Sequence, residues 1–333
     1  MAMEPDRFSV RTDLALEARE MAAEKHGENI PGVHLEQDED NGIKVTRMDI
    51  ATEEGARIIG KQQGHYITIE VPGLRRKDSE LQDRVATRFA KEFEQFLVKL
   101  GIPKDAKTLI IGLGNWNVTP DALGPMVVEN VMVTRHYFEL MPDKIAPGYR
   151  QVSAIAPGVL GTTGIETGDI VQAVVHTSKP DLLIAIDALA SKALERVNTT
   201  IQIADTGIHP GSGIGNKRKG LTRDVLGIPT IAIGVPTVVY ASTIVNSIMD
   251  MMIKYFRQRT DNTRAIFGEL EQLSDKERIS MVREVLEPMG QDLLVTPKEV
   301  DEFIEDIANI IASGLNAGLH EAIGTDNVAA YTH

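Results

Sequence analysis

The sequence predicts an α/β protein with a mostly parallel sheet and helices on both faces. Short continuous apolar runs alternate with segments of helical spacing through the middle of the chain. Strands that are buried on both faces are apolar along their whole length, which is typical of parallel sheets. The expected strands are TLIIGLG, VSAIAPG, LLIAIDAL, TIQIADTG and PTIAIGVP, and the expected helices span residues 125–139, 165–177, 188–197 and 240–256.

A small β region is expected before this sheet. IKVTRMDI and GHYITIEV alternate apolar and polar residues, which is the period of half-buried strands. A short helix is expected over residues 14–25. A second helix, LQDRVATRFAKEFEQFLVKLG, has helical spacing and should end at Gly101.

The last helix is predicted from a start signal and an apolar stripe. Thr296, Pro297 and Glu299 have the pattern of a capping box with proline at the first helical position. The stripe lies on one helix face, which should pack within the domain. It consists of Val300, Phe303, Ile304, Ile307, Ile311, Leu315 and Leu319. The preceding segment, residues 257–295, is charged and helical in character.

The composition limits the chemistry and the partners. The 333 residues include no cysteine, which excludes disulfides, thiolate nucleophiles and cysteine-bound zinc. The formal charge of −13 argues against direct binding to nucleic acid. No apolar stretch approaches the roughly 20 residues of a membrane span. The polar opening residues lack the pattern of a secretory signal, so a cytoplasmic location is expected.

Two aspartates, Asp121 and Asp187, follow apolar strands of the predicted sheet. Ligands bind beyond the carboxyl ends of parallel strands, so both side chains should lie at one edge of the sheet. One carboxylate can then activate water while the other donates a proton. Taken singly, Asp121 is equally well explained as a helix-start residue before Pro125, and Asp187 as a turn residue at a strand end.

A third aspartate and a glycine-rich loop are further candidates. Asp205 lies in an Asp-Thr-Gly triplet, which is the signature of pepsin-like proteases, but those proteins are all-β and contain two such triplets. The loop HPGSGIGNKRKG starts at His209 and carries Lys217, Arg218 and Lys219. This basic cluster could bind a phosphate or a substrate carboxylate, and a structured surface loop is the alternative.

A carboxylate-held metal is the alternative mechanism. Oxygen and nitrogen ligands could meet at the sheet edge and activate water there. The candidate ligands are Asp121, Asp187, Glu166 and His209. No cofactor is expected from the sequence, and a bound metal ion remains the alternative.

Along nearly its whole length the chain resembles the germination protease (spore protease) family. The resembling stretches include SVRTDLALEA, GLGNWNVTPDALGP, SAIAPGVLGTTGIET, ERVNTTIQIADTGIHPGSGIGNKRK and the terminal AYTH. The resemblance implies an endopeptidase that degrades small acid-soluble spore proteins during germination, with Asp121 and Asp187 as its essential aspartates. It also implies a homotetramer in the forespore or spore core. GLGNWNVTPDALG is similar to a loop of hydrogenase maturation proteases, so their phosphorylase/hydrolase-like fold is expected.

The resemblance further implies a zymogen that cleaves itself between Asp13 and Leu14. The family's substrate pattern is an acidic residue, a bulky apolar residue, Ala, any residue and Glu, and the chain reads Asp-Leu-Ala-Leu-Glu from Asp13. Residues 1–13 would then be a propeptide. Residues 14–333 would form one protease domain, in which 14–100 are an N-terminal extension, 105–256 the core sheet and 257–333 the C-terminal helices.

Three expectations about function remain open at this point. A metal-dependent hydrolase using the same carboxylates and a non-catalytic module that binds spore proteins are the alternatives to the protease. Low pH is a plausible trigger of self-cleavage, because protonation of one of two close carboxylates relieves their repulsion. The basic cluster that includes Arg218 is a candidate receiver of the acidic residue before the cleaved bond.

Overall fold

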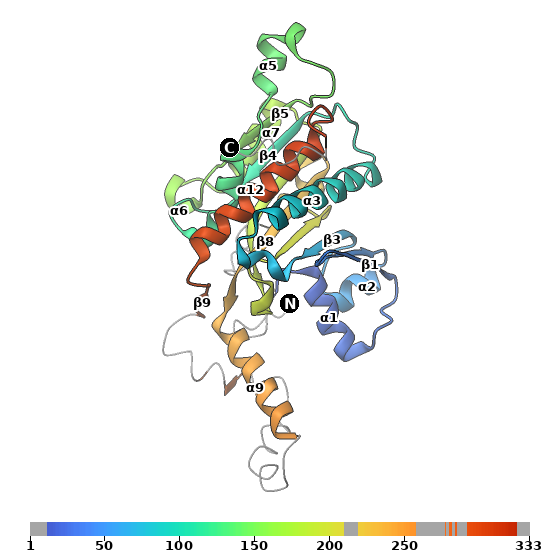
Figure 1. Cartoon of the computed structure of the whole chain (residues 1–333), viewed down its shortest axis with the longest axis vertical. Coiled ribbons are helices and arrows are strands. Elements are labelled where there is room, and N and C mark those ends of the chain that lie inside the picture. Colours follow the sequence, from blue (N-terminus) through green and yellow to red (C-terminus); the bar gives the residue numbers. More distant parts are fainter. Residues whose placement is uncertain are drawn as a thin grey trace.

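A mixed sheet of nine strands runs through the described part of the chain (Figure 1). The computed structural model describes residues 12–209, 219–257 and 292–324, together with residues 277, 280, 281 and 284. The strand order is β1-β2-β3-β7-β8-β6-β4-β5, and β9 pairs with β8. The strands are β1 (Val33–Asp40), β2 (Ile43–Ile50), β3 (Gly64–Glu70), β4 (Thr108–Gly112), β5 (Val152–Ile155), β6 (Leu182–Ser191), β7 (Thr200–Ala204), β8 (Thr230–Tyr240) and β9 (Leu294–Val295).

The helices differ widely in length. The α-helices are α1 (Ala15–His26), α2 (Glu53–Ile59), α3 (Ser79–Lys99), α4 (Leu123–Asn130), α5 (Arg135–Leu140), α6 (Leu160–Thr163), α7 (Thr167–Ser178), α8 (Arg223–Leu226), α9 (Ala241–Arg257) and α12 (Val300–Leu319). Short 3-10 helices are η1 (Pro72–Arg76), η2 (Thr119–Asp121), η3 (Pro142–Lys144) and η4 (Leu194–Arg196). None of the helices in the described ranges is long and apolar enough to span a bilayer.

The predicted α/β class is confirmed, and the sheet has a parallel half and an antiparallel half. Strands β5, β4, β6 and β8 pair in parallel. Strands β7, β3, β2 and β1 continue the same sheet with antiparallel pairing. The expected N-terminal β region is therefore an extension of the main sheet, joined to it where Tyr66 of β3 pairs with Ala204 of β7.

Helices cover both faces of the parallel half, as predicted. Residues of β4 alternate between the two faces, because successive strand side chains point in opposite directions. Ile110 packs in a cluster with Phe89 and Phe93 of α3 and with Ile311 of α12, whereas Ile111 belongs to a second cluster below α7. Figure 1 shows α3 and α12 crossing the same face of the sheet side by side.

The C-terminal helix packs as expected but begins differently. All residues of the predicted stripe are buried in α12 except Phe303, which is partly buried. The predicted capping box is wrong, because α12 begins at Val300 and has no side-chain cap. The Thr296 hydroxyl instead donates to the carbonyl oxygen of Thr237 at 2.9 Å. Pairing of β9 with β8 places Thr296 against that strand, where it cannot cap the helix.

The helix predicted over residues 188–197 is absent. β6 continues through Ser191, paired with β8, and only the short η4 follows. A continuous apolar run can form a buried strand or a buried helix, and here the pairing with β8 decides between them. The register shifts between Leu189 and Ala190, which marks a β-bulge in the extended part of the strand.

The helix predicted over residues 125–139 is divided into α4 and α5. Between them, Met132 N donates to Asn316 Oδ1 at 2.7 Å and Thr134 Oγ1 donates to Arg150 O at 2.5 Å. These bonds hold the chain against α12 and against the approach to β5, so the helix does not continue. Pro125 is the third residue of α4, within the first turn, where no intrahelical N–H bond is lost.

Candidate active site

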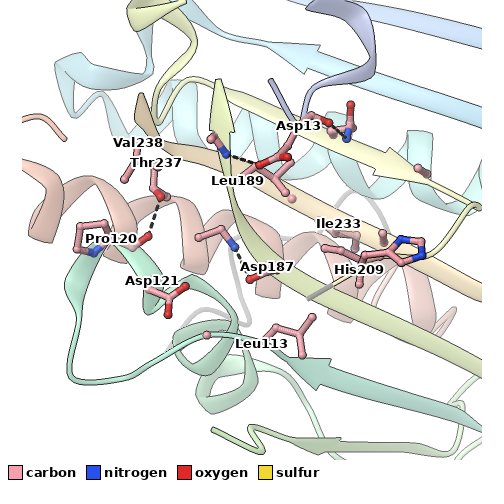
Figure 2. A pocket seen from close by; sticks show the side chains of 18 of the residues that line it. Asp13, Leu113, Pro120, Asp121, Asp187, Leu189, His209, Ile233, Thr237 and Val238 are labelled. Carbon is pink, nitrogen blue, oxygen red and sulfur yellow. Dashed lines mark hydrogen bonds between the residues drawn. The ribbon is translucent and has the colours of Figure 1, made fainter. Parts of the chain in front are cut away.

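A cavity of about 790 Å3 opens where β4 ends and β6 and β8 continue (Figure 2). It is lined by side chains from opposite ends of the sequence. The polar and charged residues around it include Asp13, Lys61, Asn115, Asp121, Asp187, Gln202 and His209. In Figure 2 the carboxyl groups of Asp121 and Asp187 face the same space beside Leu113. The structure therefore brings together the two aspartates that the sequence selected.

Asp121 is held by a tight loop between β4 and α4. It ends η2, and its carbonyl oxygen accepts a hydrogen bond from Asn115 N at 2.9 Å. Gly114 has φ +115°, and a Cβ there would lie 1.9 Å from the carbonyl oxygen of Asp121, so only glycine fits. The Thr237 hydroxyl fixes the other side of the loop by donating to Pro120 O at 2.6 Å.

Asp187 lies within β6, four residues before the strand's end. The last paired residue of β4, Gly112, is opposite Ile186, so β4 does not cover Asp187. The sequence expectation that Asp187 ends its strand is therefore wrong. It remains true that Asp187 lies just beyond the end of the neighbouring strand, at the edge where the cavity forms.

Burial is the main cause of a pKa of Asp187 well above its usual range, and the negative charge of Asp121 is the next largest. The charge of Asp13 acts in the same direction, whereas the hydrogen bond from Ala188 N, 3.0 Å long, favours the ionised form. With a raised pKa, Asp187 keeps its proton at pH values at which an ordinary aspartate has lost it. The pair can therefore present an acid and a base together.

The chain's own N-terminal segment lies beside this pair. Asp13 N donates to Ala190 O at 2.8 Å, and Ala190 N donates to Asp13 Oδ2 at 2.8 Å. Leu14 and Ala15 are fully buried. Asp13, which the sequence placed immediately before a cleavable bond, is thus bound to β6 three residues beyond Asp187 (Figure 2).

Glu17, four residues after Asp13, is also buried, and both oxygens of its carboxylate accept hydrogen bonds. Its carboxylate accepts hydrogen bonds from Lys192 N at 2.6 Å and Ala193 N at 3.0 Å. The Arg196 guanidinium lies 3.4 Å away, and the Thr12 hydroxyl donates to the same carboxylate. Backbone N–H groups and an arginine thus form a specific site for the carboxylate of a residue four positions after Asp13.

Two residues of the cavity were missed by the sequence analysis. Lys61 Nζ donates to Asp13 O at 2.9 Å and to Thr12 O at 3.2 Å. Gln202 Oε1 accepts from Ala15 N at 2.6 Å. Lys61 lies in the KQQG turn and Gln202 in an apolar strand, and neither belongs to a recognisable motif. A polar residue within a buried strand was the one available signal, and it pointed to Gln202 alone.

Of the other candidate residues that the structure describes, some line the cavity and others do not. Asp205 does not line it, and its carboxylate binds His65 through N at 2.7 Å and Nδ1 at 2.8 Å. His209 lines the cavity. Lys219 binds Asp169 at 2.7 Å, on the exposed surface. Lys217 and Arg218 lie outside the described residues, so their role as a carboxylate receiver stays a prediction.

A metal site is not indicated by the side chains that the structure places. Within the described ranges no three histidine, aspartate or glutamate residues lie close enough to hold a metal ion. The candidate ligands Glu166 and His209 do not form such a group with Asp121 and Asp187. The chemistry that the residues support directly is acid–base catalysis by two carboxyl groups and a water molecule.

Two carboxyl groups in a cleft, with a peptide segment bound beside them, are compatible with a hydrolase that acts on peptide bonds. The comparison with known families agrees with this class. The germination protease family model matches residues 12–264 and 259–332. The chain belongs to the germination protease family and is a protease.

Individual relatives match over almost the whole chain. The germination protease of Bacillus licheniformis is 51% identical, with 98% of both chains covered. The germination protease of Bacillus cereus (strain AH187) is likewise 51% identical, with 98% of both chains covered. That of Bacillus anthracis (strain CDC 684) is 50% identical with the same coverage.

Among solved structures, the [NiFe] hydrogenase maturation protease HycI from Thermococcus kodakarensis is similar. The match covers 63% of this chain and 92% of that chain, with 17% identity and a TM-score of 0.29. A TM-score this low establishes neither a shared site nor a shared chemistry.

Proposed function

We propose that this protease is made as a zymogen, cleaves its own Asp13–Leu14 bond, and then degrades small acid-soluble spore proteins in the germinating spore. One observation carries the proposal. The segment that has the substrate pattern, Asp13 to Glu17, is bound along β6 next to the Asp121 and Asp187 pair. These contacts support the proposal that this segment is the first substrate of the protease.

The two aspartates take different roles in the proposed reaction. In this proposal Asp187, whose pKa is raised, carries the proton, and Asp121 acts as the base. Asp121 removes a proton from a water molecule as its oxygen attacks the carbonyl carbon of Asp13. Asp187 gives its proton to the nitrogen of Leu14 when the C–N bond breaks. The products are a new carboxylate at Asp13 and a new amino terminus at Leu14.

The contacts of the bound segment support a rule for substrate recognition. The acidic side chain before the cleaved bond binds Ala190 N, and the Glu side chain four residues further binds the amides of Lys192 and Ala193. Leu14 and Ala15, which lie between these two acidic side chains in the sequence, are fully buried. These contacts favour acidic, apolar, small and acidic residues at the positions where the family pattern has them.

Replacing Glu17 with Ala should slow self-cleavage by about 10- to 100-fold, because a hydrogen-bonded buried charge contributes roughly 1.5–3 kcal/mol. The measurement is the first-order rate at which the intact mass converts to the Leu14 form. Glu24→Ala is the matched control, since Glu24 is an exposed residue of the same helix. Equal rates for both variants would show that Glu17 is not recognised.

The experiment that tests the proposal itself is intact mass measurement with N-terminal sequencing of the purified chain at mildly acidic pH. A new terminus at Leu14, formed with or without a chelator, is expected. Loss of cutting in the chelator would replace the carboxylate mechanism with the metal-dependent one. A chain that binds a spore protein but cuts neither itself nor that protein would favour the binding module. Membership of a protease family speaks against this outcome.

We also propose that the protein is a homotetramer in the spore core. Four large apolar side chains, Ile248, Met251, Met252 and Tyr255, are exposed on one face of α9. This helix projects away from the sheet in Figure 1, and in the proposed tetramer its apolar face packs against another copy. Native mass spectrometry should show four chains, and Met251→Glu should shift the distribution to smaller species. A wild-type chain that stays monomeric would contradict the proposal.

A further inference from the structure

Lys61 makes the closest polar contact with the carbonyl group that the proposed reaction attacks. Its Nζ lies 2.9 Å from Asp13 O, the carbonyl oxygen of the Asp13–Leu14 peptide bond. A second, longer contact of 3.2 Å joins Nζ to Thr12 O. Lys61 lies in the turn between α2 and β3, whereas Asp121 and Asp187 come from the parallel half of the sheet. Lys61 therefore reaches this carbonyl group from a different part of the fold than the two aspartates that line the same cavity.

Gln202 holds the same peptide from β7. Its Oε1 accepts from Ala15 N at 2.6 Å, and its Nε2 lies 3.5 Å from Asp13 O. The first contact fixes the chain on the leaving side of the bond. The second places a further donor near the carbonyl oxygen, at the upper limit of hydrogen bonding. Lys61 is therefore the main donor to this oxygen, and Gln202 positions the peptide beneath it.

We propose that Lys61 is a catalytic residue whose ammonium group stabilises the negative charge that develops on the Asp13 carbonyl oxygen during cleavage. The inference rests on the proposed self-cleavage. When the water oxygen bonds to the carbonyl carbon, the C=O electron pair moves to oxygen and the water proton passes to Asp121. The resulting oxyanion stays 2.9 Å from Lys61 Nζ if the oxygen does not move. It collapses as the bond to the nitrogen of Leu14 breaks and Asp187 protonates that nitrogen.

The charge of the cavity explains why a cationic donor is needed there. The carboxylate of Asp13 lines it, so an additional negative charge on the neighbouring carbonyl oxygen would be repelled. Burial lowers the pKa of Lys61, while the carboxylates of Asp13 and Glu17 raise it. A partly buried donor that is already in place stabilises a developing charge with little reorganisation, which makes it effective in catalysis.

The test compares first-order self-cleavage rates of the full-length wild type with those of Lys61→Met and Lys61→Arg. Lys61→Met keeps the unbranched chain up to the position of Cε and removes the donor, so the rate should fall by about 10²- to 10³-fold. Lys61→Arg keeps the charge and should recover part of that loss. Lys99→Met is the matched control, because Lys99 forms an exposed ion pair with Asp49 away from the cavity, and its rate should equal that of the wild type.

Amide hydrogen exchange separates catalysis from simple holding of the segment. In Lys61→Met the amides of Leu14 and Ala15 should keep their protection, because Thr12 Oγ1 and Gln202 Oε1 still accept from them. If these amides lost protection in parallel with the rate, Lys61 would only hold the segment in place, and the proposal would be overturned. An unchanged or faster rate in Lys61→Met would overturn it as well, while leaving self-cleavage intact. A wild type that never yields the Leu14 terminus would remove the proposed function, and this inference with it.

Discussion

Replacing Asp187 with Asn should abolish formation of the Leu14 terminus. The variant keeps the shape of the side chain and the bond to Ala188 N but has no proton to give, so the rate should fall by about 10⁴-fold. Asp121→Asn should cause a similar loss by removing the base. The measurement is intact mass over days at mildly acidic pH, and Asp224→Asn, an exposed aspartate of α8, is the control. Cutting at Asp13 by either variant would move the chemistry to other residues.

The same variant should be more stable than the wild type at neutral pH. Because the pKa of Asp187 is raised in the folded chain, the folded state holds its proton more tightly than the unfolded state does. Wild-type stability is fully present at a pH below the ordinary aspartate pKa and is lost as the pH rises through the raised value. Asn has no proton to lose. Thermal unfolding of intact Asp187→Asn and intact wild type should therefore differ at pH 7 and converge near pH 4.

Gly114→Ala should reduce self-cleavage by at least about 10²-fold while leaving a folded protein. The new methyl group would lie 1.9 Å from the carbonyl oxygen of Asp121, so the loop must shift and carry that aspartate out of place. A displacement of about 1 Å at a catalytic group is enough for such a loss. Circular dichroism would show whether the fold is retained, and intact mass would give the rate.

Gly101→Ala is the matched control for this glycine. Gly101 also has a positive φ, of +67°, but a Cβ there would have no atom within 4 Å. The substitution should lower stability by roughly 1–2 kcal/mol through backbone strain alone and leave the cleavage rate unchanged. If both variants lose activity equally, the loss at Gly114 comes from general destabilisation and not from a displaced Asp121.

The sequence was sufficient for those parts of the site that depend on regular strands. Asp121 and Asp187 could be placed at one edge because the apolar runs before them identify two parallel strands, and parallel strands end at a common edge. The position of Asp187 within β6 could not be predicted, since it depends on β4 being shorter than its neighbours. The helix predicted at 188–197 was wrong for a similar reason. Residues 188–191 form strand instead because they pair with β8, which lies far along the chain.

Residues that act through long-range contacts were outside the reach of sequence patterns. Lys61 is 48 positions from Asp13, and Gln202 is 187 positions from Ala15. Neither contact follows from periodicity or from a capping signal. The capping box at Thr296 failed for a related reason, since a tertiary partner, Thr237, takes the hydroxyl that a local rule assigns to the helix.

The extension of β6 beyond Asp187 has a consequence for where the enzyme cuts. One strand carries the proposed catalytic carboxylate of Asp187 and the partner of Asp13, Ala190. It leads directly to Lys192 and Ala193, whose amides bind Glu17. Since a strand advances by about 3.3 Å per residue, the number of residues in this stretch, with its bulge, fixes the spacing between these points. Inserting or deleting one residue in this stretch would change the spacing between Asp187 and the groups that bind the peptide. The enzyme would then cut at another bond or at none.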